Sequence, residues 1–339
     1  MNDRTGDIPA FNVTLVGRIA YWLAMIVAMF ALTALVVFLE RDRLVFGVAL
    51  ESLYSFQLAI YSDLLLLAAT AVYVAHWWFT SKTVGRWATA LATTGTAGIV
   101  ASVLARWFEM QRAWHVGHMP LSDLYEVTCL FTAVTMAIYL AMESFYRNRS
   151  AGAFVMPIVS AAVLLNIWLL ANGQASPNHM PADLDTLWLH AHVLANVIGY
   201  GAFTVAAGMG AFYLRLYGRE ARMEVDYSTT IRMSPRLDLL ENLMVNAMVI
   251  GYFVFVAATL LGSIWAGRVW GSYWSWEPKE VWALLVLVVY SLYFYFRGAH
   301  GHQGVRSARW AVAGFVVTLS VFIIISLFFP GQHAFARMH

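Results

Sequence analysis

Charged residues are scarce in this sequence. Only 12% of its 339 residues are Asp, Glu, Lys or Arg, whereas 61% are hydrophobic, and the mean hydropathy is +0.66. This balance excludes an ordinary soluble domain and indicates a chain that lies in a lipid bilayer. The formal net charge is only +2, and the arginines are spread over many loops, so no nucleic-acid partner is expected.

Cysteine is almost absent, because Cys129 is the only one in the chain. A single cysteine excludes an intrachain disulfide, a paired-thiol redox motif and a CxxCH haem-attachment site. Cys129 lies inside an apolar run, where we interpret it as a small apolar residue. Any haem that this chain binds is therefore not covalently held by it.

Long apolar runs are what the sequence has in abundance. A spanning helix needs roughly 20 mostly apolar residues. Such runs occur near 19–39, 58–80, 87–107, 124–145, 152–172, 191–214, 243–266, 281–297 and 309–329. The segment before the first run is polar and does not resemble a cleavable signal, so we expect that run to be retained. The sequence predicts an all-α polytopic membrane protein with about nine transmembrane helices.

Basic residues fall mostly on one side of this alternation. That side carries Arg4, Arg18, Lys82, Arg86, Arg147, Arg149, Arg215, Arg219, Arg222, Arg232, Arg236, Arg297, Arg306 and Arg309. Short cytoplasmic loops retain positive charge, so the N-terminus is predicted to be cytoplasmic and the C-terminus periplasmic. The inward loop 218–242 is charged and contains a Ser-Pro turn, which predicts a short surface helix before the next span.

The predicted topology sorts the histidines into two groups. The outer group is His115, His118, His179, His190, His192, His333 and His339, and the inner group is His76, His300 and His302. A neutral imidazole binds haem iron or a metal, so the outer group is a candidate site. The ordinary alternative for any single member is an interfacial histidine that is bonded to water or to a loop carbonyl.

Tryptophan is concentrated beside that outer group. The stretch RVWGSYWSWEPKEVWALL, residues 268–285, holds four tryptophans and runs straight into an apolar helix. Aromatic belts occur at both membrane interfaces, but they scatter their residues along the chain. Bunched indoles around EPKE instead suit a large planar amphipathic ligand such as haem. From the residues alone, the belt and the bound planar ligand remain alternatives for this Trp-rich amphipathic outer-face segment.

Four stretches together resemble a known family. WGSYWSWEPKEVWALL resembles the WWD signature of the haem-handling proteins of cytochrome c maturation, and most closely that of the CcsA/ResC branch of system II. GHMPLSDLYEV (117–127), LWLHAHVLANVIGYGAF (187–203) and FFPGQHAFA (328–336) resemble the same branch and occur in the same order. We therefore divide the chain into N-terminal helices, 1–105, and a CcsA/ResC-like haem-handling core, 106–339, that includes the WWD segment near 265–282.

The resemblance implies a haem site at the outer face. Two histidines, His192 and His333, are expected as axial ligands of the haem iron, while His190 competes for the first role and His118 could line the site. The residues of the WWD segment expected to contact haem are Trp270, Trp274, Trp276, Glu277, Lys279 and Trp282. Relatives also tend to have a histidine at an inward entry site, where this chain has Tyr295, so His76 and Tyr295 are candidates for an inner haem site.

The resemblance also implies the activity. Haem b, bound non-covalently in transit, would be carried to the periplasmic face of the bacterial inner membrane and presented for thioether attachment to the CxxCH motif of apocytochrome c. A ResB/CcsB-like membrane protein is the expected partner in a holocytochrome c synthase. Two alternatives stay open: an exporter of haem or another anion without synthase activity, and a membrane scaffold that binds no haem. For Asp123 and Glu126 in PLSDLYE, a role at the start of a helix is at least as plausible as ligand contact.

Overall fold

The computed structural model describes residues 54–113, 119–175, 184–224 and 235–320. Every secondary-structure element within these ranges is a helix. The elements are α2 (Tyr54–Phe79), α3 (Lys82–Ala113), α4 (Leu124–Tyr146), the short 3-10 helix η2 (Arg149–Ala151), α5 (Gly152–Ala171), α6 (Leu187–Glu224), α7 (Pro235–Val269), α8 (Pro278–His300) and α9 (Val305–Ser320).

Seven of the described helices are long and apolar enough to cross a membrane. They coincide with the seven apolar runs from 58–80 to 281–297, which confirms an all-helical multi-pass membrane protein. The run 19–39 lies outside the described residues and 309–329 lies partly outside them, so the total of about nine stays a prediction. The division at residue 105 is likewise untested.

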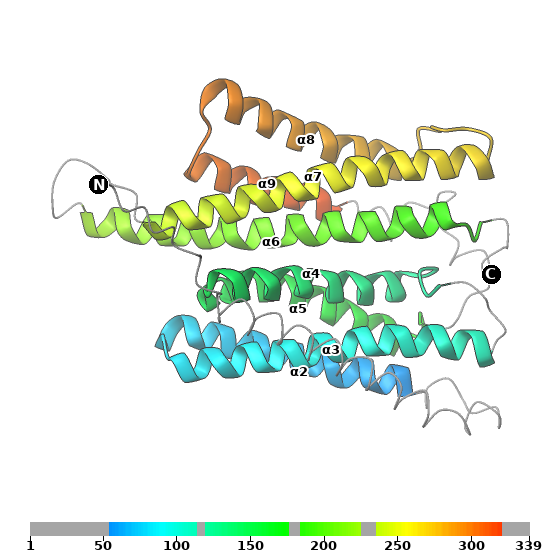
Figure 1. Ribbon diagram of the computed structural model, residues 1–339, viewed down its shortest axis with the longest axis horizontal. Coiled ribbons are helices and arrows are strands. Elements are labelled where there is room, and N and C mark those ends of the chain that lie inside the picture. The colour runs from blue at the N-terminus through cyan, green and yellow to red at the C-terminus, as the bar shows by residue number, and fades with distance from the viewer. Residues whose placement is uncertain (1–53, 114–118, 176–183, 225–234, 321–339) are drawn as a thin grey trace, which may run out of the picture.

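The helices lie side by side in an elongated bundle (Figure 1). The α2–α3 pair forms one side, α4 and α5 follow, α6 runs through the middle, and α7, α9 and α8 form the opposite side. One continuous hydrophobic core extends from Phe56 on α2 to Phe315 on α9. Because α6 is the central helix, it must accept neighbours on several faces.

Four glycines on α6 make this central position possible. A Cβ atom would press against Phe255 of α7 at Gly199, Thr135 of α4 at Gly201, Val155 of α5 at Gly208, and Ala308 of α9 at Gly210. Each glycine thus admits a different helix at close range, as small residues do between membrane helices.

Helix boundaries follow local signals in the sequence. Asp123 is the N-cap of α4, and its carboxylate accepts a 2.7 Å hydrogen bond from the backbone N–H of Glu126. This confirms the predicted helix-start role of Asp123. In the described part of 218–242 no separate surface helix is present, because α6 continues to Glu224 and α7 already begins at Pro235. The part of that prediction that falls on 225–234 lies outside the described residues.

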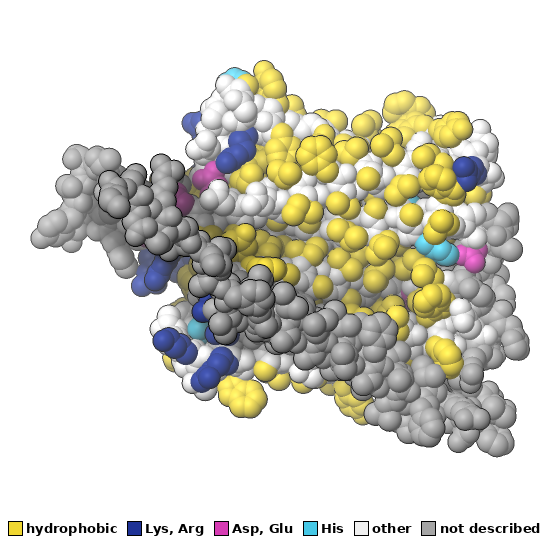
Figure 2. Space-filling model, in the orientation of Figure 1, with side chains coloured by type: hydrophobic (Ala, Val, Ile, Leu, Met, Phe, Trp, Pro, Cys, Tyr) yellow, Lys and Arg dark blue, Asp and Glu magenta, His cyan; other side chains and the backbone are white. Residues whose placement is uncertain are grey.

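The two ends of the bundle differ in charge. The described basic residues at the end where α2, α4, α6 and α8 terminate are Lys82, Arg86, Arg147, Arg149, Arg215, Arg219, Arg222, Arg236, Arg297, Arg306 and Arg309. Figure 2 shows Lys and Arg side chains gathered at this end of the surface, with an apolar belt between the two ends. We call it the inner end, after the predicted topology, and the opposite one the outer end.

Candidate functional site

Three helix ends meet at the outer end of the bundle. The start of α6, the end of α7 and the start of α8 lie together there, on the right in Figure 1. The connection from Val269 to Glu277 between α7 and α8 is most of the Trp-rich segment. The fold therefore brings that segment to the same end as His190 and His192 near the start of α6.

His192 is seated against α7. Its Nδ1 lies 2.7 Å from the backbone oxygen of Ala258. A carbonyl oxygen only accepts hydrogen bonds, so Nδ1 carries the proton and the lone pair of the neutral ring is on Nε2. A Cβ atom at Gly262 would overlap Cε1 and Nδ1 of the imidazole, so the ring fits only because residue 262 is glycine.

His190 has a different environment from His192. It lies about 200° round the helix from His192, and its Nε2 is 2.9 Å from Oδ1 of Asp185, in the segment before α6. Both side chains of this pair remain partly exposed. The two histidines thus differ in partner: His190 faces a carboxylate near the surface, whereas His192 faces the backbone of α7.

Some of the tryptophan side chains pack the end of α7 against the segment before α6. Trp265 is fully buried, and its Nε1 donates to the backbone oxygen of Leu184 at 3.3 Å. The ring of Trp270 meets that of Trp265 edge to face at 4.8 Å, and the guanidinium of Arg268 lies 4.5 Å from the ring centre of Trp188. These contacts fix the point from which the connection to α8 leaves α7.

The other tryptophans of the segment are less enclosed. Trp276 is 71% exposed, and its ring meets that of Trp274 edge to face at 5.9 Å. Trp276 has a φ of 60°, a left-handed conformation that costs a bulky residue of order 1–3 kcal/mol. Trp282 lies in the first turns of α8, and its buried indole Nε1 has no hydrogen-bond acceptor within the described residues. The segment thus holds an exposed indole in a strained conformation and an indole N–H without an acceptor.

The EPKE sequence starts helix α8. Glu277 is the N-cap, Pro278 occupies the first turn, and Glu280 reaches back to the preceding loop. The Glu280 carboxylate accepts hydrogen bonds from the backbone N–H of Ser275 at 2.8 Å and of Glu277 at 3.2 Å. This is a capping box with proline at the helix start. The signal was present in the sequence, but our interpretation of EPKE as ligand-binding overlooked it.

Comparison with known proteins identifies the family. Residues 121–333 match the model of the family described as Cytochrome C assembly protein, which is more than half of the chain. The chain belongs to this family. The match begins within PLSDLYE and contains the start of α6, the Trp-rich segment and the FFPGQH stretch, so the four stretches that carried the resemblance fall in it or at its edge.

Individual relatives extend this similarity beyond the family match. The chain is 26% identical over 298 residues to cytochrome c biogenesis protein CcsA of Gloeobacter violaceus, covering 74% of this chain and 86% of the relative. It is 27% identical over 302 residues to the CcsA of Synechococcus sp. strain CC9311, covering 82% and 96%, and 28% identical over 270 residues to that of Prochlorococcus marinus strain NATL1A, covering 72% and 83%. This confirms the predicted resemblance to CcsA.

Two of the predicted haem-contacting histidines, His118 and His333, lie outside the described residues. Within the described residues, His192 and the Trp-rich segment lie at the same, outer end of the bundle. The ligand set of the family therefore stays a prediction for this chain.

The two candidates for an inner haem site lie apart in this fold, and the inner site stays a prediction. His76 lies at the inner end of α2, with Nδ1 2.9 Å from the backbone oxygen of Ser81. Tyr295 lies on α8, is 60% exposed and has its ring 5.8 Å from that of His300. Helices α2 and α8 are on opposite sides of the bundle (Figure 1), so His76 and Tyr295 remain two separate candidates.

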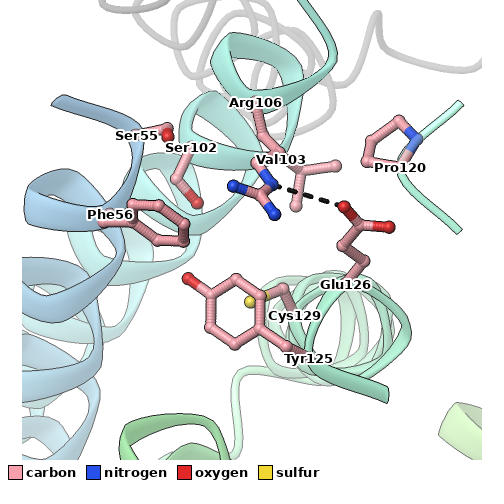
Figure 3. A pocket seen from close by; sticks show the side chains of 9 residues that line it. All are labelled: Ser55, Phe56, Ser102, Val103, Arg106, Pro120, Tyr125, Glu126 and Cys129. Atoms are coloured by element: carbon pink, nitrogen blue, oxygen red, sulfur yellow. Dashed lines mark hydrogen bonds and ion pairs between the residues drawn. The ribbon is translucent and has the colours of Figure 1, made fainter. Parts of the chain in front are cut away.

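A polar cluster that sequence reasoning missed lies where PLSDLYE begins α4. Figure 3 shows the guanidinium of Arg106, from α3, directed into a space between Phe56, Tyr125 and Glu126. Its Nε lies 3.3 Å from Oε1 of Glu126, and both side chains are almost completely buried. Burial and the neighbouring Glu126 carboxylate raise the pKa of Asp123.

The space at Arg106 is small. The cavity measures about 10 Å³, room for roughly one water molecule, and Ser102 and Cys129 complete its wall. It cannot admit a planar macrocycle. We interpret the cluster as the element that joins α3 to α4 at the outer end.

Proposed function

We propose that this protein holds haem at the outer end of the bundle, with His192 and His333 as axial ligands beneath the Trp-rich segment, and presents it for attachment to apocytochrome c. The observation that supports this proposal most directly is the seat of His192. Its Nδ1 bond to Ala258 leaves the lone pair on Nε2, the tautomer that a ligand of iron needs. The proposed role of His333 is supported only by its position in the FFPGQH stretch.

The chemistry of the Trp-rich segment suits haem as the substrate. Indole rings provide flat apolar faces for a macrocycle, and the buried Nε1 of Trp282 offers a donor without an acceptor among the described residues. Lys279, in the first turn of α8, supplies a cation for the haem carboxylates. The strained conformation of Trp276 is the kind of feature that a binding site retains.

The chain's own residues would act mainly by positioning. His192 and His333 would hold the iron with two imidazoles, and the Trp-rich segment would fix the orientation of the ring and its vinyl groups. A cysteine thiol of the CxxCH motif then adds across each vinyl group, with sulfur bonding to one carbon and the thiol hydrogen to the other, so no net oxidation occurs. Catalysis of this kind rests on proximity and orientation.

Partner and location follow from the same proposal. The bundle would lie in the bacterial inner membrane with its basic end in the cytoplasm. Exposed apolar side chains on α8, such as Leu284, Val288 and Leu292, face lipid or a second membrane protein. We propose a ResB/CcsB-like protein as the partner with which the chain forms a synthase.

The first test is the visible absorption spectrum of the detergent-purified protein, co-expressed with its partner, for wild type, His192→Ala, His333→Ala and His190→Ala. We expect a reduced bis-imidazole haem spectrum in wild type. We also expect its loss in His192→Ala and in His333→Ala, with recovery on adding imidazole. Retention of the full spectrum in His192→Ala together with its loss in His190→Ala would transfer the ligand role to His190.

A second measurement separates attachment from transport. The same variants are co-expressed with an apocytochrome that bears CxxCH, and covalent haem on the denatured cytochrome is measured by its stain in a gel. We expect product with wild type and none with His192→Ala. Haem in the purified wild-type protein without any covalent product would favour an exporter, and no haem at all would favour a scaffold.

A further inference from the structure

Buried polar side chains are concentrated in one half of the bundle, the helices α2–α5, which we call the polar half. Those that lie on these helices or cap α4 are Ser55, Ser62, Asp63, Thr96, Ser102, Arg106, Glu109, Asp123, Glu126, Thr128, Thr132, Thr135, Glu143 and Asn166. The others in the described ranges are Thr204, Glu241, Ser307 and Thr318. The Trp-rich segment joins α7 to α8 on the opposite side of the bundle (Figure 1), so the proposed haem site does not account for this polar core.

Asp63 differs from the other buried carboxyl groups of the polar half. It is 2% exposed and lies well inside α2, about 13 Å along the helix axis from Tyr54. Its Oδ1 has no hydrogen-bond partner within the described residues. A carboxyl group that only joins helices is expected to be paired, as Glu126 and Glu143 are with arginines. An ionisable side chain without such a pair inside a membrane is costly, and it typically marks a path for ions or protons.

On its outer side, Asp63 approaches the small cavity of Figure 3. It lies close enough to Tyr125 and Cys129 of α4 for its charge to act on both. Both of these side chains line the cavity, which has room for roughly one water molecule. Glu126 lines it as well and accepts hydrogen bonds from Ser122, which is partly exposed in the loop before α4. Polar groups therefore lead from the water at the outer end toward Asp63.

On its inner side, the polar core ends at Glu143 in the last turn of α4. The hydroxyls of Tyr73 and Tyr139 donate to Oε2 of Glu143 at 2.6 Å and 2.7 Å. The other carboxylate oxygen, Oε1, lies 3.5 Å from Nε of Arg149, whose side chain is partly exposed at the inner end. Glu143 thus connects the buried hydroxyls of α2 and α4 to a charged group that reaches water.

Hydroxyl groups occupy the interval between Asp63 and Tyr73, which is about 15 Å long along α2. The hydroxyl oxygens of Thr70 on α2 and Ser160 on α5 are 2.7 Å apart. Thr135 on α4 is buried, and its Oγ1 has no hydrogen-bond partner within the described residues. A hydroxyl both donates and accepts, so it can take up one proton while it gives up another. Water molecules that enter between these hydroxyls would complete a path to Glu143.

We propose that the polar half carries protons between the water at the outer end and the water at the inner end, with Asp63 as the central carrier. A proton binds to one carboxyl oxygen and leaves from the other, so Asp63 returns to its starting charge and nothing is oxidised or reduced. Tyr125 and Cys129, the titratable side chains of α4 that face Asp63, are much weaker acids than a carboxyl group. Asp63 is therefore the group in this cluster that exchanges the proton.

The test measures proton uptake into liposomes that contain the purified full-length protein. Phosphatidylcholine liposomes are loaded with potassium and a pH-sensitive dye, and valinomycin then lets potassium leave, so an inside-negative potential draws protons inward. The test variant is Asp63→Asn, which keeps the shape of the side chain and removes the proton-binding carboxyl group. The matched control is Glu241→Gln, which changes a buried carboxylate of α7 that is paired with Arg297 at 2.8 Å.

We expect liposomes with wild type or with Glu241→Gln to acidify faster than liposomes without protein. Asp63→Asn is expected to lower the rate of uptake by about tenfold or more, because a positioned proton carrier typically contributes at least that factor. Uptake by Asp63→Asn at the wild-type rate overturns the inference. So does wild-type uptake that is no faster than in liposomes without protein.

The haem spectrum of the same preparations separates this inference from the proposed function, which depends on other residues. Asp63→Asn should keep the wild-type spectrum, because Asp63 and the Trp-rich segment lie on different sides of the bundle. Loss of proton uptake with retention of the spectrum supports the proposed carrier role of Asp63. Loss of both would show that Asp63 maintains the fold, and the inference fails. Wild type that takes up protons but holds no haem would refute the proposed function and leave this inference standing.

Discussion

Gly262→Ala is expected to lower haem affinity at the outer end by about tenfold or more without unfolding the bundle. The added Cβ atom would overlap the Cε1 and Nδ1 atoms of the His192 ring. Overpacking of this kind costs about 1–3 kcal/mol. The ring is the more mobile of the two groups, so it is expected to leave its seat and lose the bond to Ala258. Absorbance titration of the purified variant with haem measures the effect.

The matched control for this variant is Gly218→Ala, on α6. A Cβ atom at Gly218 meets nothing within 4 Å, so the change adds only the helix propensity of alanine. We expect Gly218→Ala to bind haem like wild type. Equal haem affinity in Gly262→Ala and Gly218→Ala would show that the seat of His192 against α7 has no part in haem binding.

Most of the fold was predictable because hydropathy determines which segments cross the bilayer. Each of the seven apolar runs between 58 and 297 corresponds to a described helix. Hydropathy does not predict where a helix ends beyond the bilayer. The extensions of α6 and α7 past their apolar runs were therefore not predicted. Small residues within α6 predicted close packing, but which helix approaches Gly201 or Gly208 depends on the whole arrangement.

The candidate site was predictable in its position and not in its contacts. Alternation of the spans placed His190 and His192 at the same end as the Trp-rich segment. The spacing of two residues shows only that the two rings face different directions. Which direction meets α7 depends on Ala258, 66 residues further along the chain, and on the missing side chain of Gly262.

Some short motifs fit two structural interpretations, and these account for the remaining differences between the predicted and the observed contacts. EPKE matches the WWD signature, and it is also a capping box, so the charge of Glu280 serves the start of α8. Likewise, no role was predicted for Arg106, and its partner Glu126 was considered only for the start of a helix or for ligand contact. Their pairing across α3 and α4 involves two segments that a single sequence does not connect.

Glu126→Leu is expected to destabilise the protein by about 3–5 kcal/mol, the cost of leaving the buried guanidinium of Arg106 without its partner. Glu126 also accepts two 3.0 Å hydrogen bonds from Ser122, through its backbone N–H and its hydroxyl, so the same change frees the loop before α4. The measurement is the free energy of unfolding in mixed micelles.

The double variant Arg106→Met/Glu126→Leu shows whether stability depends on the interaction between the two residues or on each residue separately. If the loss in Glu126→Leu comes from an unpaired buried cation, then removing that cation as well should recover part of the stability, because apolar residues of similar volume can replace a buried ion pair at little cost. The double variant should also keep the haem spectrum, since the small cavity beside Arg106 excludes haem from this cluster. The single variant Arg106→Met is measured as well. If its cost simply adds to that of Glu126→Leu in the double variant, the two residues act independently, and other contacts hold the junction of α3 and α4.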